Sequence, residues 1–434
     1  MRRAWTKRPS TREPLAARAH ACSDHPVLPL LNRSNRCVSR SHVATLIALL
    51  RDAKVDETAF APSFLAQIPG LQVEQIARQL RETNGTVVGV ASITAESTTQ
   101  ALVSIDYADA AVTVRIALEA PEPHRFIGLL ITDVSRRGDS VEALIGDIKK
   151  LPGTSALVIA KLGAQRPAPS ATYNAEIPVA TGSMFKLFVF AELVRETEAK
   201  ERRWTDVVPL GPPSLPSGVT QNWPRRLPVT LATLATEMIS ISDNTATDTL
   251  IETLGHAKVD EMRANVGNTR GALPMLSTLE AFSLKMPRNE ALRNRWIAGE
   301  VGARRQVLRE LPPTLTTIDF SALAGPPLHI NTVEWPATMT EIVNVLDLLR
   351  RTRSQTAVDI LGINSSLPVA ARSRFDVIGY KGGSESGVIA MSWLLKAKSG
   401  QWFAVAAAWN NAAQGTDSVQ CYALMMRAIA LVGR

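Results

Sequence analysis

Cysteine is scarce in this sequence and cannot organise the fold. The 434 residues contain three cysteines, Cys22, Cys37 and Cys421, two near the start and one in an apolar run near the end. An odd set without a recurring spacing predicts neither a disulfide framework nor a metal site. Stability must therefore come from hydrophobic cores, and 45% hydrophobic residues over this length suffice for two or three domains.

Long apolar runs are absent as well. No stretch approaches the length of a membrane span, and the longest apolar run in the first forty residues, Val27 to Leu31, is broken by Pro29. This run is too short for the apolar core of a secretory signal, so we favour a cytoplasmic location. A transit peptide, a mis-assigned start codon and a solvated tail remain open for this segment.

Net charge is nearly absent from the body of the chain. Of the formal +8, residues 1–40 carry +7, from nine lysines and arginines against Glu13 and Asp24, which leaves about +1 for the rest. The basic total is therefore no argument for nucleic-acid binding. Because residues 1–40 also lack a periodic apolar face, we predict that they form a basic, disordered leader.

Residues 41–134 predict a small α+β unit. Apolar residues at three-to-four spacing predict helices, and period-two alternation then predicts strands joined by short turns. The expected helices are 43–51, 57–67 and 71–83, and the expected strands are 86–94, 101–107, 111–118 and 126–132. His124 lies beside two prolines, as loop residues do. We assign the unit to binding, scaffolding or dimerisation, so a homo-oligomer stays open.

The second domain is expected over residues 138–434, after a charge run that ends in a glycine. Its first candidate for chemistry is the stretch T-G-S-M-F-K at 181–186. An apolar run follows, which places Ser183 at the first turn of a buried helix and Lys186 on the same face. Burial and the positive helix end should lower the pKa of Lys186, so that a neutral amine can accept the serine proton.

Two further elements carry candidate residues. Ser242-Asp243-Asn244 follows a predicted helix, where such a polar triplet commonly caps the next helix without any chemistry. Residues 378–384 read as a strand with Lys381 and a glycine pair, and the strands 386–395 and 402–408 follow. Gly-rich strand ends are often turns, but they also let a ligand approach the backbone closely.

Together, S-x-x-K at Ser183, S-D-N at Ser242 and K-G-G-S at Lys381 resemble, in this order, the active-site set of class A β-lactamases and penicillin-binding proteins. The resemblance covers residues 139–434. It implies an antiparallel sheet flanked by helices, which makes the whole chain a combination of α+β and α/β units. It also implies that neither a metal nor an organic cofactor is needed.

A finer resemblance rests on residues 214–218, on Trp223-Pro224 and on the N-terminal unit. These features are similar to a β-lactamase-like subgroup that includes a protein of clavam biosynthesis. In that subgroup a steroid-isomerase-like domain precedes the hydrolase domain. Residues 41–134 would then be a steroid-isomerase- or cystatin-like domain.

The resemblance implies a role for each matching residue. Ser183 attacks a carbonyl, Lys186 takes its proton, and Ser242 relays that proton to the leaving group with help from the positive Lys381. Asn244 holds the substrate amide and the Lys186 side chain. The backbone amides of two serines stabilise the oxyanion. The oxyanion donors are Ser183 and Ser384, and the further substrate-binding positions are Ser384, Gly383, Thr220 and Trp223.

Departures from the family pattern concern deacylation and the substrate. Class A β-lactamases carry an E-x-x-L-N loop whose glutamate activates water, and the only glutamate near that place is Glu280, without the asparagine. We expect Glu280 on the exposed side of an amphipathic helix or capping its start, with a water-activating role as the alternative. Gly382 replaces threonine, and the strand 386–395 has no arginine for a substrate carboxylate. Lys381 must then bind that carboxylate alone, or the substrate is not the usual β-lactam.

Two classes of function follow. The first is a serine hydrolase that forms an acyl-enzyme with a β-lactam, an ester or a small amide and deacylates slowly. The second is a covalent binder or sensor that acylates but hardly turns over, as penicillin-binding proteins do with their inhibitors. A third reading, a degenerate scaffold for the N-terminal pocket, is disfavoured because the three motifs are chemically complete.

Overall fold

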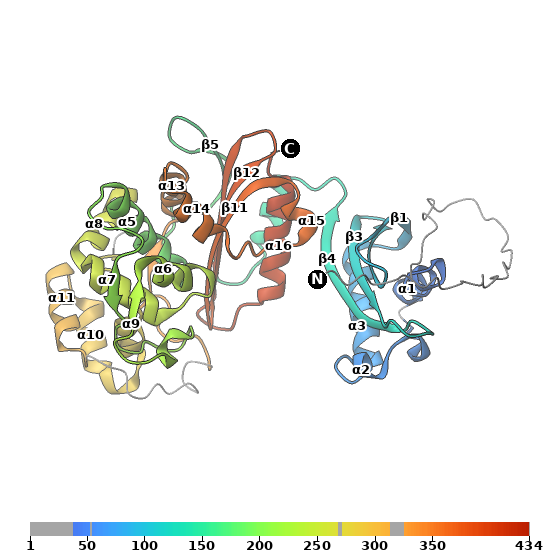
Figure 1. The fold of residues 1–434 in the computed structure, drawn as a ribbon, viewed down its shortest axis with the longest axis horizontal. Coiled ribbons are helices and arrows are strands. Elements are labelled where there is room, and N and C mark those ends of the chain that lie inside the picture. Colours follow the sequence, from blue (N-terminus) through green and yellow to red (C-terminus); the bar gives the residue numbers. More distant parts are fainter. Residues whose placement is uncertain (1–37, 53, 268–270, 313–324, 434) are drawn as a thin grey trace, which may run out of the picture.

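The structure, a computed structural model, describes residues 38–433 except 53, 268–270 and 313–324, and it contains two units (Figure 1). The first unit is drawn in blue and cyan, and the larger second unit follows it. The predicted leader lies outside the described residues up to position 37. Its last residues belong to the first unit, because Val38 is 4% exposed and Arg40 begins the first helix.

Helices pack on one face of an antiparallel sheet in the first unit, as predicted. The strand order is β1-β2-β3-β4. Every second residue of β3 is buried, because one face of the sheet packs on the helices and the other does not. The elements are α1 (Arg40–Asp52), α2 (Pro62–Leu65), α3 (Gly70–Asn84), β1 (Val87–Ala95), β2 (Gln100–Tyr107), β3 (Ala110–Leu118) and β4 (Phe126–Arg136).

The single helix predicted over 57–67 is wrong. A 3₁₀ turn at Glu57–Ala59 is followed by an extended residue, Ala61, and only then by the short helix α2. Pro62 explains the break, because proline lacks an amide hydrogen and forces the residue before it into an extended conformation. Pro62 therefore occupies the first position of α2, where a missing N–H costs nothing.

A five-stranded antiparallel sheet organises the second unit, with the order β11-β12-β13-β5-β6. Almost every residue of β5, β12 and β13 is buried, because helices cover both faces of the sheet. The edge strand β6 was not predicted, since its exposed residues and Pro169 hide the alternation. The strands are β5 (Thr154–Leu162), β6 (Ala168–Tyr173), β11 (Phe375–Glu385), β12 (Val388–Ala397) and β13 (Trp402–Asn410).

The two faces of this sheet have separate cores. Helices α4 (Val141–Ile148) and α16 (Ser418–Leu431) pack on one face around Trp393. The other face packs on α5 (Lys186–Glu198) and α13 (Met339–Arg350), beyond which lies a layer of helices (Figure 1). The other helices are α6 (Leu231–Ser240), α7 (Asn244–Leu254), α8 (His256–Val266), α9 (Thr278–Lys285), α10 (Glu290–Ala298), α11 (Val301–Glu310), α14 (Gln355–Gly362) and α15 (Val369–Arg372).

Short elements complete the second unit. The 3₁₀ turn Gly182–Phe185 leads into α5, and two further turns of this kind are Thr220–Asn222 and Pro287–Asn289. Strand β7 (Val179–Ala180) pairs with β10 (Pro336–Ala337), and β8 (Val207–Pro209) pairs with β9 (Pro228–Thr230). The pair β8–β9 closes the ends of the long proline-rich loop.

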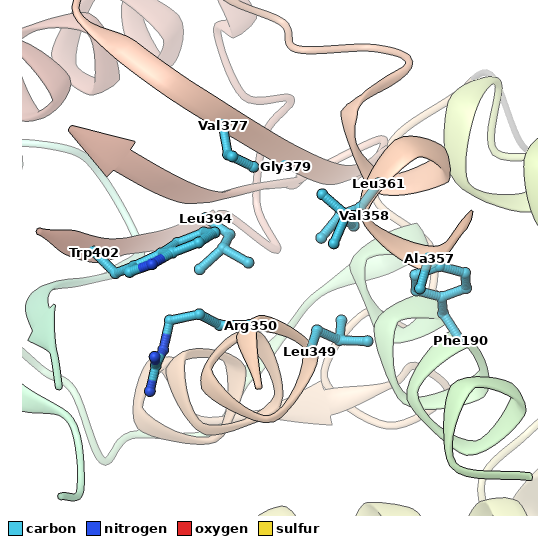
Figure 2. Close-up of a pocket in the computed structure, with 10 residues that line it drawn as sticks. All are labelled: Phe190, Leu349, Arg350, Ala357, Val358, Leu361, Val377, Gly379, Leu394 and Trp402. Carbon is cyan, nitrogen blue, oxygen red and sulfur yellow. The ribbon is translucent and has the colours of Figure 1, made fainter. Parts of the chain in front are cut away.

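A small apolar gap lies where α5, α13 and α14 meet the sheet (Figure 2). Its volume is about 10 Å³, and Leu349, Leu361 and Leu394 are among the side chains that line it. A gap of this size holds at most one water, and an apolar lining gives a water no partners. It is therefore a packing defect in the core and not a binding site.

The two units meet at β4, which lies beside α15 and α16 (Figure 1). Next to this junction, Arg427 of α16 donates to both oxygens of Asp139 and to Asp147. Arg136, the last residue of β4, forms an ion pair with the same Asp147. Within the described residues, no helix is both long and apolar enough to cross a membrane.

Candidate active site

The S-x-x-K motif lies at the buried start of α5. Ser183 is in the 3₁₀ turn that precedes the helix, and it remains partly exposed, whereas Met184 and Phe185 beside it are fully buried. Phe185 stacks on Trp335 at 4.3 Å between ring centroids, which fixes the turn against the segment before β10. The serine is thus presented to solvent from a turn that cannot move freely.

Lys186 is 0% exposed and its amine is held by three oxygens. The Nζ atom donates to the Ser242 carbonyl at 2.6 Å, to Ser242 Oγ at 3.1 Å and to Asn244 Oδ1 at 2.8 Å. No hydrogen bond joins Nζ to Ser183 Oγ among the described residues, although the sequence predicts that contact. Catalytic hydrogen bonds often form only once substrate is bound.

The pKa of Lys186 is lowered well below its usual value, as predicted. Burial is the main cause, and the nearby charge of Lys381 lowers the pKa further, against two opposing aspartates. Both causes favour the neutral amine, whose lone pair can accept a proton. This is the protonation state that a general base requires.

Ser242 links the first motif to the third. Its hydroxyl oxygen accepts from Lys186 Nζ at 3.1 Å and from Lys381 Nζ at 2.9 Å, so it lies between the two amines. The backbone of Ser242 has φ of +63°, a left-handed conformation that costs free energy in a residue other than glycine. Such strain commonly marks a functional position. Burial lowers the pKa of Lys381 to about 7.

Asp243 caps α7 through its bond from the Ala246 amide, which confirms the capping interpretation for this residue. It also holds the proline-rich loop, because it accepts from the Val219 and Thr220 amides and from the Thr220 hydroxyl. A Cβ at Gly218 would lie 2.2 Å from its carboxylate, so only glycine allows this approach. The loop is thereby fixed beside Ser242.

Thr220 is 0% exposed and its hydroxyl donates to Asp243, which holds the loop in place. A direct contact between Thr220 and the substrate stays a prediction. Trp223 is partly buried against the main core, and its contact with substrate stays a prediction. Asn244 is 2% exposed and directs its Oδ1 to Lys186, as the resemblance implies.

Strand β11 runs directly against the serine turn. A Cβ at Gly383 would lie 2.2 Å from the Thr181 carbonyl oxygen and 2.4 Å from the Ser183 amide nitrogen. A Cβ at Gly182 would lie 3.1 Å from the Ser384 amide nitrogen. The amides of Ser183 and Ser384 therefore come close together beside an exposed position, as two oxyanion donors must.

A contact within the same strand explains why position 382 is a glycine and not the threonine of the family pattern. A Cβ at this position would lie 2.3 Å from the Tyr380 hydroxyl oxygen, two residues earlier on the same strand. Any side chain there would have to displace Tyr380. The tyrosine therefore occupies space beside the strand that a threonine would need.

Glu280 caps the start of α9, one of the two positions expected for it. Its carboxylate accepts from the Ser277 amide at 2.7 Å while the Ser277 hydroxyl accepts from the Glu280 amide, which is a capping box. Burial raises the pKa of Glu280. No hydrogen bond connects it to Ser183 or Lys186 among the described residues.

Three charged residues behind the serine turn were not predicted. Lys285, Glu334 and Glu385 form a buried cluster in which the lysine amine contacts both carboxylates. They come from three separate segments, and each reads as an ordinary surface charge in the sequence. Only the fold brings them together, so no sequence signal could have found them.

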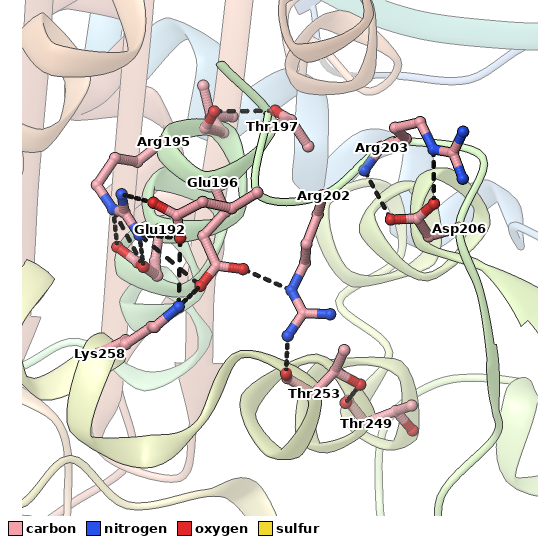
Figure 3. Close-up of polar contacts among 12 residues, drawn as sticks. Glu192, Arg195, Glu196, Thr197, Arg202, Arg203, Asp206, Thr249, Thr253 and Lys258 are labelled. Carbon is pink, nitrogen blue, oxygen red and sulfur yellow. Dashed lines mark hydrogen bonds and ion pairs between the residues drawn. The ribbon is translucent and has the colours of Figure 1, made fainter. Parts of the chain in front are cut away.

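A second charged network anchors the far half of α5 (Figure 3). Glu196 is 0% exposed and accepts from Arg202 Nε and Lys258 Nζ, each at 2.5 Å. Arg195 joins Glu192 to Glu201, and Lys258 also reaches Glu201. These pairs connect α5 to α8, so the helix that begins with Lys186 is fixed at both ends.

Residues 136–298 match the model of a family described as the β-lactamase enzyme family. This stretch includes Ser183, Lys186, Ser242 and Asn244, and it ends before Lys381. Over these residues the second unit is similar to that family. No curated protein matches this chain.

Solved structures of related description also match. A β-lactamase from Sphaerobacter thermophilus is 20% identical, with 67% of this chain and 94% of that chain covered at a TM-score of 0.45. A protein named PBP-A is 12% identical, with 67% and 94% covered at 0.46. A β-lactamase from Desulfarculus baarsii is 16% identical, with 68% and 100% covered at 0.45.

Proposed function

We propose that this protein is a β-lactamase-like serine hydrolase that forms an acyl-enzyme on Ser183 with a small β-lactam, ester or amide. One observation carries the proposal. The Ser242 hydroxyl is held between two buried amines, Lys186 at 3.1 Å and Lys381 at 2.9 Å, beside a partly exposed Ser183. Two buried lysines that share one hydroxyl serve no packing purpose, whereas they suit a proton relay.

In the acylation step, Ser183 Oγ forms a bond to the substrate carbonyl carbon and its proton passes to neutral Lys186. The bond from that carbon to the leaving nitrogen or oxygen then breaks. The Ser242 hydroxyl passes the proton from Lys186 to the leaving atom, while the charge of Lys381 supports the relay. The backbone amides of Ser183 and Ser384 bind the oxyanion, where each such donor contributes roughly 3 to 4 kcal/mol.

Deacylation is the slow step in this proposal. The Glu280 carboxylate is already occupied by its own capping box, which supports the view that it does not activate water. Loss of a placed general base costs roughly 10² to 10⁴ in rate. The alternative function, a penicillin-binding covalent binder or sensor with little turnover, is the limit of the same chemistry when deacylation stops.

Activated esters test the slow deacylation. We expect a burst of released leaving group equal to the enzyme concentration, followed by a slow steady phase. Glu280→Gln should leave both phases unchanged. Fast turnover of a chromogenic cephalosporin that collapses in Glu280→Gln, with acylation intact, would instead identify Glu280 as the deacylating base.

The finer resemblance to the clavam-biosynthesis subgroup is part of the proposal. It is supported by the order of the two units, a helix-on-sheet unit ahead of the hydrolase unit. A steroid-isomerase- or cystatin-like role for residues 41–134 stays a proposal of the same kind. We assign this unit to binding, scaffolding or dimerisation rather than to catalysis.

A further inference from the structure

The buried charges behind the serine turn form a compact set, the Lys285 cluster, defined as Lys285, Glu334 and Glu385. The side chains of the three residues are 1%, 2% and 18% exposed. Lys285 Nζ donates to Glu334 Oε1 at 2.7 Å and to Glu385 Oε1 at 2.5 Å. Burying three ionisable groups is costly unless they pair, so this arrangement calls for a reason beyond packing.

Each carboxylate of the Lys285 cluster is attached to one of the two segments that bear the oxyanion amides. Glu334 Oε2 accepts from the Gly182 amide at 3.3 Å, one residue before Ser183. Glu385 follows Ser384 directly at the end of β11. Lys285 therefore links Gly182, the residue before Ser183, through Glu334 to Glu385, the residue after Ser384.

The net charge of the Lys285 cluster is zero if one of its two glutamates is protonated. Burial and the neighbouring Glu334 raise the pKa of Glu385 well above its usual value. Burial opposes the charge on Lys285, yet the two carboxyl groups raise its pKa, so the amine stays positive. With Glu385 protonated, the cluster holds one negative and one positive charge, so its net charge is zero where its side chains are largely buried.

We propose that the Lys285 cluster positions the oxyanion hole by holding the Ser183 and Ser384 amides at the spacing that one oxyanion needs. This inference rests on the proposed function. The three residues touch no reacting atom and are positioning residues. The tolerance is small, because β11 already approaches the serine turn so closely that Gly383 admits no Cβ.

The variant Glu385→Ala removes one tie and leaves the buried pair Lys285–Glu334 intact. We expect the acylation rate constant and the affinity for a boronic acid, which forms a tetrahedral adduct on the serine, to fall about 10- to 100-fold. The dissociation constant of the non-covalent substrate complex should stay unchanged. Glu385→Gln, which keeps a neutral hydrogen-bonding group, should retain most of the rate.

Lys258→Met is the matched control, because Lys258 also bridges two glutamates, Glu196 and Glu201, but touches neither oxyanion segment. It should leave acylation and boronate affinity unchanged. If Lys285→Met folds, its acylation rate and boronate affinity should fall as they do in Glu385→Ala. Wild-type acylation and boronate affinity in folded Glu385→Ala would overturn the inference, whatever Lys285→Met does.

Amide hydrogen exchange separates this inference from the proposed function. If the wild-type protein forms no adduct at all, the proposed function fails, but the cluster can still be tested. Faster exchange at residues 182–184 and 384–386 in Glu385→Ala, but not in Lys258→Met, would support a positioning role. Unchanged exchange there would overturn it even if acylation of Ser183 is established.

Discussion

At the scale of single residues, the proposed mechanism depends on two lysines in opposite protonation states. Lys186 must be neutral to accept the Ser183 proton, and burial together with Lys381 lowers its pKa to allow this. Lys381 must be charged to support the relay and to bind a substrate carboxylate, yet burial lowers its pKa to about 7. The two requirements are compatible only over a limited pH range.

The pH dependence of acylation follows from these directions. Acylation by a carboxylated β-lactam should rise with pH as Lys186 loses its proton, and then fall by about tenfold per pH unit above pH 7 as Lys381 loses its own. The value of kcat/KM, or the second-order acylation constant, measured from pH 5 to 9 reports the alkaline limb for the free enzyme. In Lys381→Met the acylation rate should be much lower, and its decrease at alkaline pH should be absent.

A flat profile between pH 6 and 9 in the wild type would contradict this assignment of the two lysines. A neutral ester offers the matched comparison, because it has no carboxylate to bind. Its alkaline limb should be shallower than that of the β-lactam if Lys381 mainly binds the carboxylate. Equal limbs for both substrates would instead assign Lys381 to the relay alone.

At the scale of elements, α5 carries the proposed base, Lys186, at one end and a buried carboxylate near the other. Glu196 is fully buried and takes part in three ion pairs, with Arg195, Arg202 and Lys258, whose side chains reach solvent (Figure 3). Glu196→Gln keeps the shape and removes the charge, which should cost about 2 kcal/mol of unfolding free energy. The melting temperature should fall by roughly 4 to 8 °C.

The acylation rate of Glu196→Gln should remain that of the wild type, because the network lies at the far end of α5 from Ser183. The control Glu201→Gln changes a carboxylate that is 43% exposed, so its melting temperature should hardly move. A large loss of acylation in a folded Glu196→Gln variant would show that this network acts on the site.

Elements with strong local patterns were predictable, and their pairing was not. The alternation in β2 and β3 and the buried run after Ser183 could be read from the sequence, because each depends on neighbours in the chain. The Lys285 cluster could not be predicted, because its residues lie about fifty positions apart in the sequence and belong to no periodic pattern. The bond from the Thr220 hydroxyl to Asp243 could not be predicted for the same reason, because only the folded loop brings the two residues together.

At the scale of the whole molecule, the residues proposed for chemistry all lie between 182 and 385, inside the second unit. The first unit meets the second at β4 and α16, where a cavity of about 240 Å³ is lined by Asp133, Arg374 and Met426 among others. A protein of residues 138–434 should therefore acylate at the wild-type rate and melt at a lower temperature. Loss of acylation from folded 138–434 would assign the first unit a part in the reaction.

The central claim is that Ser183 forms the acyl-enzyme, and intact-mass measurement tests it most directly. The protein is mixed with a panel of β-lactams and activated esters and its mass is followed over time, beside Ser183→Ala. We predict one stoichiometric acyl adduct that forms quickly in the wild type, decays slowly, maps to the peptide containing Ser183, and is absent from Ser183→Ala. An adduct of the same mass that persists in Ser183→Ala, or no adduct with any compound in the wild type, would contradict the account.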